Sequence, residues 1–289
     1  GMGRGVPKDY ELAHMWFGNY VTLSWWNDLW LNEAFATFIG RKITNQVYPE
    51  SEAMVQHLRS SHSAMNSDSL PAARKIRQPI QSHHDIHNAF DGITYSKGAA
   101  FLSMIENLIG PDKFQAGVAE FLRQHANNIA TADDLLFALE AQSNQPITAL
   151  AKTFLEQAGV PQVAVKSLCD DKGARLHLKQ ERYLKMGLST AENPLWKIPM
   201  CFKLGEKNKK CILLDQKESS IPLDNCPDWI FPNADASGYY RFVQSTEDNK
   251  KLIKNISLLN LHEKLALADS LKAAFKSGNM TFEQLLPYI

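Results

Sequence analysis

Apolar residues recur every three or four positions through the first 158 residues of the chain. In the stretch 111–124, Phe114, Val118, Phe121 and Leu122 follow the i, i+4, i+7, i+8 spacing that places side chains on one face of a helix. The pattern predicts helices over residues 7–17, from residue 29 onward and over 50–66, and further helices that begin near residues 97, 111, 131 and 146. Residues 67–84, which contain two prolines and many polar side chains, are predicted to form a loop.

The pattern changes at Gly159. From residue 162 to residue 244, apolar and polar residues alternate in seven short runs separated by turn sequences. Alternation is typical of strands with one buried face, and seven such strands predict a β-sandwich. Residues 245–289 return to helical spacing. The predicted fold class is therefore α+β, with a helical part over residues 1–159, a β-sandwich over 160–245 and a short helical segment over 246–289.

Composition and charge narrow the range of functions. The 289 residues carry 31 basic and 31 acidic side chains, and 44% of the chain is hydrophobic. A balanced charge gives no reason to expect binding to nucleic acid or to an anionic membrane. No apolar run reaches the roughly 18 residues that a membrane-spanning helix requires. We therefore expect a globular protein whose partners are neither nucleic acids nor membranes.

Four cysteines lie in the predicted strand region, at Cys169, Cys201, Cys211 and Cys226. None of them has the C-x-x-C spacing of a zinc ribbon. Free thiols in a reducing cytoplasm and a set of disulfides are the two interpretations. We expect free thiols, and hence a cytoplasmic location.

The chemistry concentrates in residues 10–38. Glu11 is followed by His14, and eighteen residues separate His14 from Glu33. A histidine at position 10 would complete H-E-x-x-H-x18-E, but Tyr10 stands there. Two imidazoles at i and i+4 share one helix face and can bind one zinc ion, while the neighbouring Glu activates the bound water. A second helix, which carries Glu33, would supply the third ligand.

Each of these residues also has a purely structural interpretation. An isolated E-x-x-H on an apolar helix is more often a capping or core feature than a metal site. Asp28, just before the second predicted helix, suits an N-cap, and Tyr95 before a helix suits the core. The histidines in and after the 67–84 loop are interpreted as surface residues: His83, His84 and His87.

The whole block is much more specific than its parts. E-L-A-H-x-W-F-G-N is followed by W-W-N-D-L-W-L-N-E-x-F-A, and a Y-x-K-G-A segment begins at Tyr95. These motifs closely resemble the aminopeptidase N family of zinc metallopeptidases (gluzincins). The resemblance implies the helical half of a thermolysin-like catalytic domain, then a β-sandwich that ends near N-A-D-A-S-G-Y-Y-R-F-V-Q, then the start of a C-terminal helical domain.

The resemblance also implies roles for individual residues around one zinc ion. His14 and Glu33 would be metal ligands, and Tyr10 replaces the family's first histidine. Glu11 would be the general base and later the acid, and Tyr95 would donate a hydrogen bond to the oxyanion. Asp28 would orient a ligating histidine.

Three departures from the family pattern bear on activity. Tyr10 could bind a metal only as a phenolate, and its ordinary pKa near 10 makes that form costly. The G-x-M-E-N segment that holds the substrate's amino group in the family is absent from these residues. Ala34 stands where the family usually has glycine, which we regard as a minor change.

The family function is removal of N-terminal residues from peptides by zinc-activated water, and we expect this chain to have it with an impaired metal site. The alternative is an inactive, truncated peptidase remnant that at most binds peptides or a protein. We leave open whether the chain is an enzyme. We expect the family's N-terminal part to be missing, through natural truncation, deliberate shortening of the expressed chain or a misplaced gene start. Self-association or a partner chain would then cover the surface left behind.

Overall fold

The computed structural model describes residues 6–171 and 173–288, with side chains from Asp9 onward. Two compact units emerge from the pattern of contacts. The first runs to Asp68 and continues from Ala73 to Ala158, and the second comprises Ser69–Ala72 and the residues from Gly159 onward.

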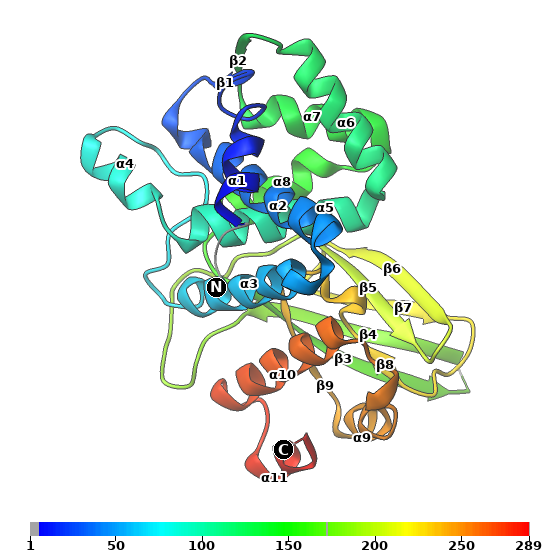
Figure 1. Cartoon of the computed structure of the whole chain (residues 1–289). Coiled ribbons are helices and arrows are strands. Elements are labelled where there is room, and N and C mark those ends of the chain that lie inside the picture. The colour runs from blue at the N-terminus through cyan, green and yellow to red at the C-terminus, as the bar shows by residue number, and fades with distance from the viewer. Residues whose placement is uncertain (1–5, 172, 289) are drawn as a thin grey trace. The chain divides into compact units, whose positions relative to one another are not determined.

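The first unit is helical, as predicted (Figure 1). A short parallel pair of strands, β1 (Val21–Leu23) and β2 (Asn128–Ala130), accompanies the helices. The helices described are α1 (Val6–His14), α2 (Leu29–Val47), α3 (Ala53–Asp68), α4 (His83–Ala89), α5 (Gly98–Ile109), α6 (Pro111–Gln124), α7 (Ala132–Ser143) and α8 (Ile147–Leu155). The predicted helix over residues 7–17 ends three residues early. After His14 the chain turns back, and Gly18 adopts a φ of +129° that favours glycine.

Aromatic packing fixes α2 in the middle of this unit. The ring of Phe35 on α2 stacks on Phe17 at 3.6 Å between centroids and lies 6.4 Å from Phe114 on α6. Phe17 also stacks on Phe121, at 5.8 Å. All four rings are almost completely buried. Because large aromatic rings bury much apolar surface, this stack holds the turn that follows α1 against α2 and α6.

The second unit contains two sheets, formed within residues 161–244 by the strands β3 (Pro161–Asp170), β4 (Gly173–Arg182), β5 (Ile198–Leu204), β6 (Asn208–Leu214), β7 (Glu218–Leu223), β8 (Ile230–Phe231) and β9 (Arg241–Gln244). One sheet has the order β7-β4-β3-β9 and the other β6-β5-β8. β3 pairs antiparallel with β4 and parallel with β9. The predicted strands are confirmed where the structure describes them.

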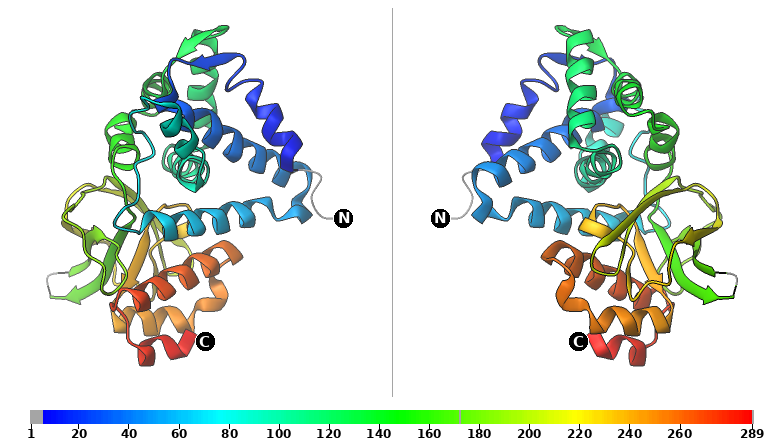
Figure 2. Two further views of the ribbon diagram at one scale, coloured as in Figure 1. Left: turned by 90° about the vertical axis from the view of Figure 1, so that its left-hand side faces the viewer. Right: turned by 90° about the vertical axis from the view of Figure 1, so that its right-hand side faces the viewer.

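The helices described after the last strand are α9 (Thr246–Lys254), α10 (Leu261–Lys276) and α11 (Phe282–Leu285). They lie together in both views of Figure 2. Arg241 on β9 pairs with Asp269 on α10, at 2.9 Å between Nε and Oδ2, which ties α10 to the sheet. The boundary proposed at residue 245 stays a prediction. None of the described helices is both long and apolar enough to cross a membrane.

The expectation of free thiols is wrong. Cys169 is bonded to Cys226, and Cys201 to Cys211. Cys201 and Cys211 lie directly opposite each other in the register of β5 and β6, a relation that cysteine spacing along the chain does not reveal. Disulfides persist mainly in oxidising compartments. The expected cytoplasmic location therefore loses the observation on which it rested.

Candidate functional site

The site is built where α1 lies against α2. Asp9 on α1 accepts a hydrogen bond from Thr44 Oγ1 on α2, at 2.6 Å. Gly40 allows the two backbones to approach, because a Cβ atom at this position would lie 3.2 Å from the Tyr10 N and Cα atoms. Tyr10 and His14 are one turn apart on α1 and so share the helix face that meets Glu33.

Tyr10 and Glu33 are directly connected. The phenol of Tyr10 donates a hydrogen bond to Glu33 Oε2. The Tyr10 ring also stands edge-on to the His14 ring, at 4.6 Å between centroids and 87° between planes. The side chain that replaces the family's histidine thus occupies one carboxylate oxygen of the predicted metal ligand.

His14 is oriented by two acceptors. Its Nδ1 lies 3.0 Å from the carbonyl oxygen of Phe17, and its Nε2 lies 3.6 Å from Glu33 Oε2. The hydrogen bond with Glu33 raises the pKa of His14, although burial works in the opposite direction. The imidazole nitrogen that would face a metal is therefore already directed at the carboxylate.

Glu33 carries the negative charge of this group. Burial raises the pKa of Glu33, but the hydrogen bonds with His14 and Tyr10 outweigh it, so that the net pKa is lowered. Burial and the Glu33 carboxylate together raise the pKa of Tyr10 strongly. At neutral pH Tyr10 is thus a neutral phenol beside an ionised Glu33.

Tyr95 joins the same cluster. It lies in a short π-helix, Ile93–Lys97, which sequence analysis missed because a single π-helical turn has no distinct hydrophobic period. Burial and the Glu33 carboxylate raise the pKa of Tyr95, and its phenol also interacts with Tyr10. The structure therefore brings together four of the predicted site residues: Tyr10, His14, Glu33 and Tyr95.

The π-helix is braced at both ends. At its start, Asp91 Oδ1 accepts hydrogen bonds from the backbone N–H groups of Ile93 and Thr94, at 2.8 and 3.3 Å. Arg74 pairs with Asp91 and donates to Thr94 Oγ1 at 2.7 Å.

At the end of the π-helix, Lys97 Nζ lies 2.8 Å from Asp68 Oδ2, and neither side chain is exposed. These contacts position the Tyr95 phenol and have no simple sequence motif.

Glu11 lies on the exposed side of α1. Its negative charge contributes to the raised pKa of His14. Its role as general base stays a prediction.

Asp28 contacts Arg77 and the start of α7, and its predicted role of orienting a ligating histidine stays a prediction. Its carboxylate pairs with Arg77 Nε at 2.9 Å and accepts a hydrogen bond from the Ala132 N–H, at the start of α7, at 3.0 Å. Burial raises the pKa of Asp28. Asp28 occupies the N-cap position of α2, but its side chain makes no capping hydrogen bond there. Its described contacts hold α7 and Arg77, whereas His14 is oriented by Phe17.

The side chains of the cluster do not provide enough ligands for zinc. A catalytic zinc ion takes three protein ligands and keeps one position open. Among residues 6–171 and 173–288, no three His, Cys, Asp or Glu side chains converge in a way that could hold a metal ion. His14 and Glu33 are the two suitable donors of the cluster, and the third position is filled by the neutral Tyr10 phenol. This set does not fit the three-ligand zinc site.

An apolar groove lies elsewhere in the first unit, and none of the four cluster residues lines it. It has a volume of about 590 Å³ and is bordered by side chains of α1, α2 and α6. Trp16 and Phe17 line it near the end of α1, and the ion pair of Lys42 with Glu106 contributes its polar part. A volume in this range suits an apolar side chain or a small ligand.

The three expected surface histidines are confirmed. His83, His84 and His87 lie on α4 and are exposed.

The helix pair thus has the spacing of a metallopeptidase motif, with Tyr10 in place of one metal ligand. Residues 9–154 match the peptidase family M1 domain. The matched segment is about half of the 289 residues. The chain belongs to peptidase family M1.

Relatives of known name support this assignment. The chain is 31% identical over 281 residues to "Tricorn protease-interacting factor F2" of Thermoplasma volcanium, a match that covers 97% of this chain and 34% of the relative. It is 32% identical to "Aminopeptidase M1-D" of Oryza sativa subsp. japonica, over 97% of this chain and 33% of the relative. It is also 32% identical to "Probable aminopeptidase 2" of Sulfurisphaera tokodaii, over 94% and 34%. The chain thus spans about a third of the length of these relatives.

Proposed function

We propose that this chain is a family M1 peptidase segment that binds peptides and does not hydrolyse them on its own. The observation that carries the proposal is the hydrogen bond from Tyr10 to Glu33. It leaves two protein donors where a catalytic zinc site requires three. The names of the relatives, which include aminopeptidases, favour peptides as the ligand class.

The cluster has the groups that a peptide backbone requires. The ionised Glu33 carboxylate can accept hydrogen bonds from peptide N–H groups, and the neutral Tyr95 phenol can donate to a peptide carbonyl. The apolar groove of the same unit has the volume to hold an apolar side chain. Peptide binding therefore needs no metal in this proposal.

Aminopeptidase activity is the second candidate. The observation that favours it is the place of Tyr95 beside Glu33, where the resemblance puts the donor to the oxyanion. In that case Glu11 would act as base, and zinc would be held with help from outside the described donors. The fold would then be the helical half of a thermolysin-like domain, and we propose that the two sheets of the second unit stack as a β-sandwich.

Exposed apolar side chains at the end of α1 and just after it favour association with another chain. Leu12, Met15 and Trp16 are each more than half exposed. Exposed apolar patches of this kind commonly mark interaction surfaces. We propose self-association or a partner protein at this face, which sedimentation of the wild type and of Leu12→Glu would test; equal sedimentation at all concentrations would count against it. A cytoplasmic location stays a prediction, and the two disulfides are evidence against it.

The deciding experiment measures zinc and turnover on the same preparation. The wild-type chain is dialysed against metal-free buffer and analysed for zinc, then assayed for hydrolysis of amino-acid anilides and for binding of fluorescent peptides. We expect less than about 0.2 zinc per chain, no turnover above that of Glu11→Gln, and saturable peptide binding. One zinc per chain with turnover that Glu11→Gln abolishes would establish the second candidate. If the folded wild-type chain bound no peptide, the peptide-binding proposal would be refuted.

A further inference from the structure

Arg41 on α2 is a partly buried cation that has no acidic partner among the described residues. Its guanidinium contacts two side chains of α3, His57 and Ser60. The other arginines described as partly or fully buried each form an ion pair with a carboxylate: Arg74, Arg77, Arg175, Arg182 and Arg241. Because removal of a charge from water is costly, buried charges in proteins are normally paired. Arg41 is thus an exception within its own chain.

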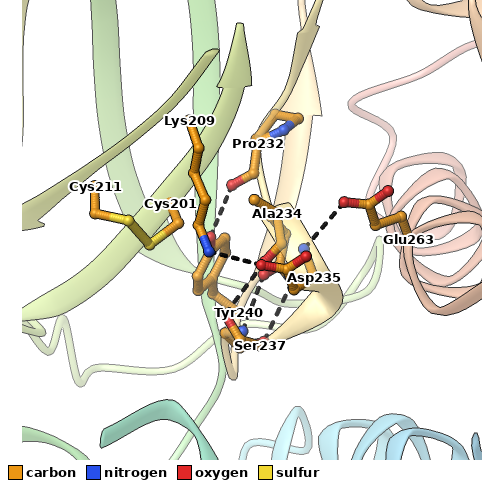
Figure 3. Close-up of a disulfide and its surroundings, with 11 residues drawn as sticks. Cys201, Lys209, Cys211, Pro232, Ala234, Asp235, Ser237, Tyr240 and Glu263 are labelled. Carbon is orange, nitrogen blue, oxygen red and sulfur yellow. Dashed lines mark hydrogen bonds and ion pairs between the residues drawn. A yellow bond between two sulfur atoms is a disulfide. The ribbon is translucent and has the colours of Figure 1, made fainter. Parts of the chain in front are cut away.

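Two lysines of the second unit show how the chain compensates a positive charge elsewhere. Lys203 Nζ lies 2.7 Å from Glu263 Oε2, and Lys209 Nζ lies 2.6 Å from Asp235 Oδ2 (Figure 3). Lys209 is exposed to solvent and still has a carboxylate beside it. Arg41 is less exposed than Lys209, so the cost of leaving its charge uncompensated is higher.

Two neutral side chains hold the Arg41 guanidinium in place. Arg41 Nη1 lies 3.3 Å from His57 Nδ1, and Arg41 Nη2 donates a hydrogen bond to Ser60 Oγ at 3.2 Å. His57 and Ser60 are three residues apart on α3 and so share one face of that helix. Because a guanidinium has donors only, His57 Nδ1 accepts this hydrogen bond and the imidazole is neutral. The guanidinium is therefore oriented by its partners but not neutralised by them.

The electrostatics of this position agree with its contacts. Burial lowers the pKa of Arg41, and no acid of the described chain offsets this effect. Burial lowers the pKa of Arg77 as well, but Asp28 and Asp133 outweigh burial there, so that the net pKa is raised. Burial and the charge of Arg41 together lower the pKa of His57. An anion at this position would therefore stabilise a local positive charge that the described residues leave uncompensated.

The arrangement leaves hydrogen-bond donors that an anion can use. A guanidinium has more N–H donors than the contacts with His57 and Ser60 occupy. Ser60 Oγ accepts a hydrogen bond from Arg41, so its own hydrogen can be donated to a further acceptor. Arg41 and Ser60 are both partly exposed, which gives an anion access from solvent.

We propose that Arg41 and Ser60 form a binding site for an oxyanion, supplied as free phosphate or as the carboxylate of another molecule. Two N–H groups of a guanidinium match two oxygens of either anion, and such charge-assisted pairs are stronger than neutral hydrogen bonds. Arg41 lies eight residues after Glu33 on α2. The site includes none of the four cluster residues, so it does not rest on the proposed peptide binding.

The test follows the Arg41 Nε–H signal of the whole chain by proton–nitrogen NMR. Sodium phosphate replaces sodium chloride at constant ionic strength and near-neutral pH, and Arg41→Lys identifies the signal by its loss. We expect a saturable shift with a Kd of about 1 mM, because one guanidinium and one hydroxyl make a small site. A parallel titration with sodium acetate distinguishes the two sources, and the site is assigned to the anion that binds more tightly. If neither anion gave a saturable shift relative to chloride, the proposal would be overturned.

Three variants separate this site from general attraction by surface charge, with the backbone amides of residues 57–60 as the readout. Arg41→Gln should raise the Kd at least about tenfold and Ser60→Ala about threefold, because the charged group contributes more than the hydroxyl. Arg59→Gln removes an exposed cation next to Ser60 in the sequence and should leave the Kd unchanged. Wild-type affinity in Arg41→Gln, or an equal loss of affinity in Arg59→Gln, would contradict the assigned site.

Discussion

The hydrogen bond between Tyr10 and Glu33 determines how the candidate site can work. Glu33 lies where a metallopeptidase helix pair needs its acidic ligand, and the Tyr10 phenol occupies one of its oxygens. Both pKa shifts strengthen this arrangement, because Glu33 is held ionised and Tyr10 is held neutral. A neutral phenol donates a hydrogen bond to a carboxylate and is a poor ligand for a metal.

Replacement of Tyr10 by histidine should therefore create zinc affinity. Tyr10→His would place two imidazoles at i and i+4 on α1 opposite Glu33, which is the donor set of a catalytic zinc site. We expect the zinc content after dialysis to rise from near zero to about one per chain, as measured by elemental analysis.

Tyr10→Phe is the matched control for this substitution. It removes the hydroxyl and frees Glu33 but adds no donor, so it should stay zinc-free. Zinc binding by Tyr10→Phe would show that the hydrogen bond alone blocks the metal. A zinc-free Tyr10→His variant would mean that side-chain identity at position 10 is not what limits the site.

The buried ion pair of Lys97 with Asp68 should be essential to the first unit. Neither side chain is exposed, and the Lys97 Nζ also approaches the carbonyl oxygen of Gln157 at 3.4 Å. Lys97→Met would leave a buried carboxylate without its cation, which typically costs about 3–5 kcal/mol. Urea unfolding should show a loss in this range.

Two comparisons make the ion-pair prediction specific. Lys42→Met breaks a pair that is partly exposed at Lys42, and should cost about 1 kcal/mol or less. Joint substitution of Asp68→Leu with Lys97→Met removes both charges and should recover most of the lost stability. Equal losses for Lys42→Met and Lys97→Met would contradict the importance of burial at this pair.

Local sequence patterns predicted most of the helices and strands, because amphipathic periodicity directly reflects which face is buried. Motif spacing selected Tyr10, His14 and Glu33, and the family resemblance added Tyr95; the structure brings all four together. The predicted end of α1 lies three residues too late. The Gly18 turn and the stack of Phe17 on Phe35 compete with continuation of the helix. Such tertiary competition is not encoded in the local pattern.

Contacts between distant segments explain the other errors. Asp28 was interpreted as a possible helix cap, whereas its carboxylate contacts Arg77 and the Ala132 amide, 49 and 104 residues away. The cysteines were expected to be free, because the register that places Cys201 opposite Cys211 depends on the pairing of β5 with β6. Neither relation has a signature in sequence spacing.

The packing of α5 on α2 predicts a strong effect of a single methyl group. A Cβ atom at Gly98 would lie 2.7 Å from the Cβ of Ala34, which is closer than side chains tolerate. Gly98→Ala should therefore destabilise the chain by about 1–3 kcal/mol through overpacking. The melting temperature and urea midpoint both report this loss.

Gly92→Ala is the control for Gly98→Ala. Gly92 has helical angles, and a Cβ atom there would meet nothing within 4 Å. This change should be neutral or stabilise by up to about 1 kcal/mol, since alanine restricts the unfolded chain. Gly98→Ala combined with Ala34→Gly should regain part of the stability if the methyl–methyl contact is the cause.

Acid should destabilise the first unit through His57. This α3 residue is 6% exposed, and its Nδ1 lies 3.3 Å from Arg41 Nη1. Burial, together with the positive charge of Arg41, lowers the pKa of His57 to about 3. In the unfolded chain the same imidazole takes up a proton near pH 6.5.

Between pH 6.5 and pH 3 the unfolded state binds one more proton than the folded state at this position, so stability must fall as the pH falls. Between pH 6.5 and pH 4.5 the loss from His57 is at most about 2–3 kcal/mol. His57→Gln retains an acceptor for Arg41 and cannot titrate, so urea unfolding of this variant should change less over that interval. His83→Gln, at an exposed position, should follow the wild type. Parallel acid losses in wild type and His57→Gln would show that other groups control the acid sensitivity.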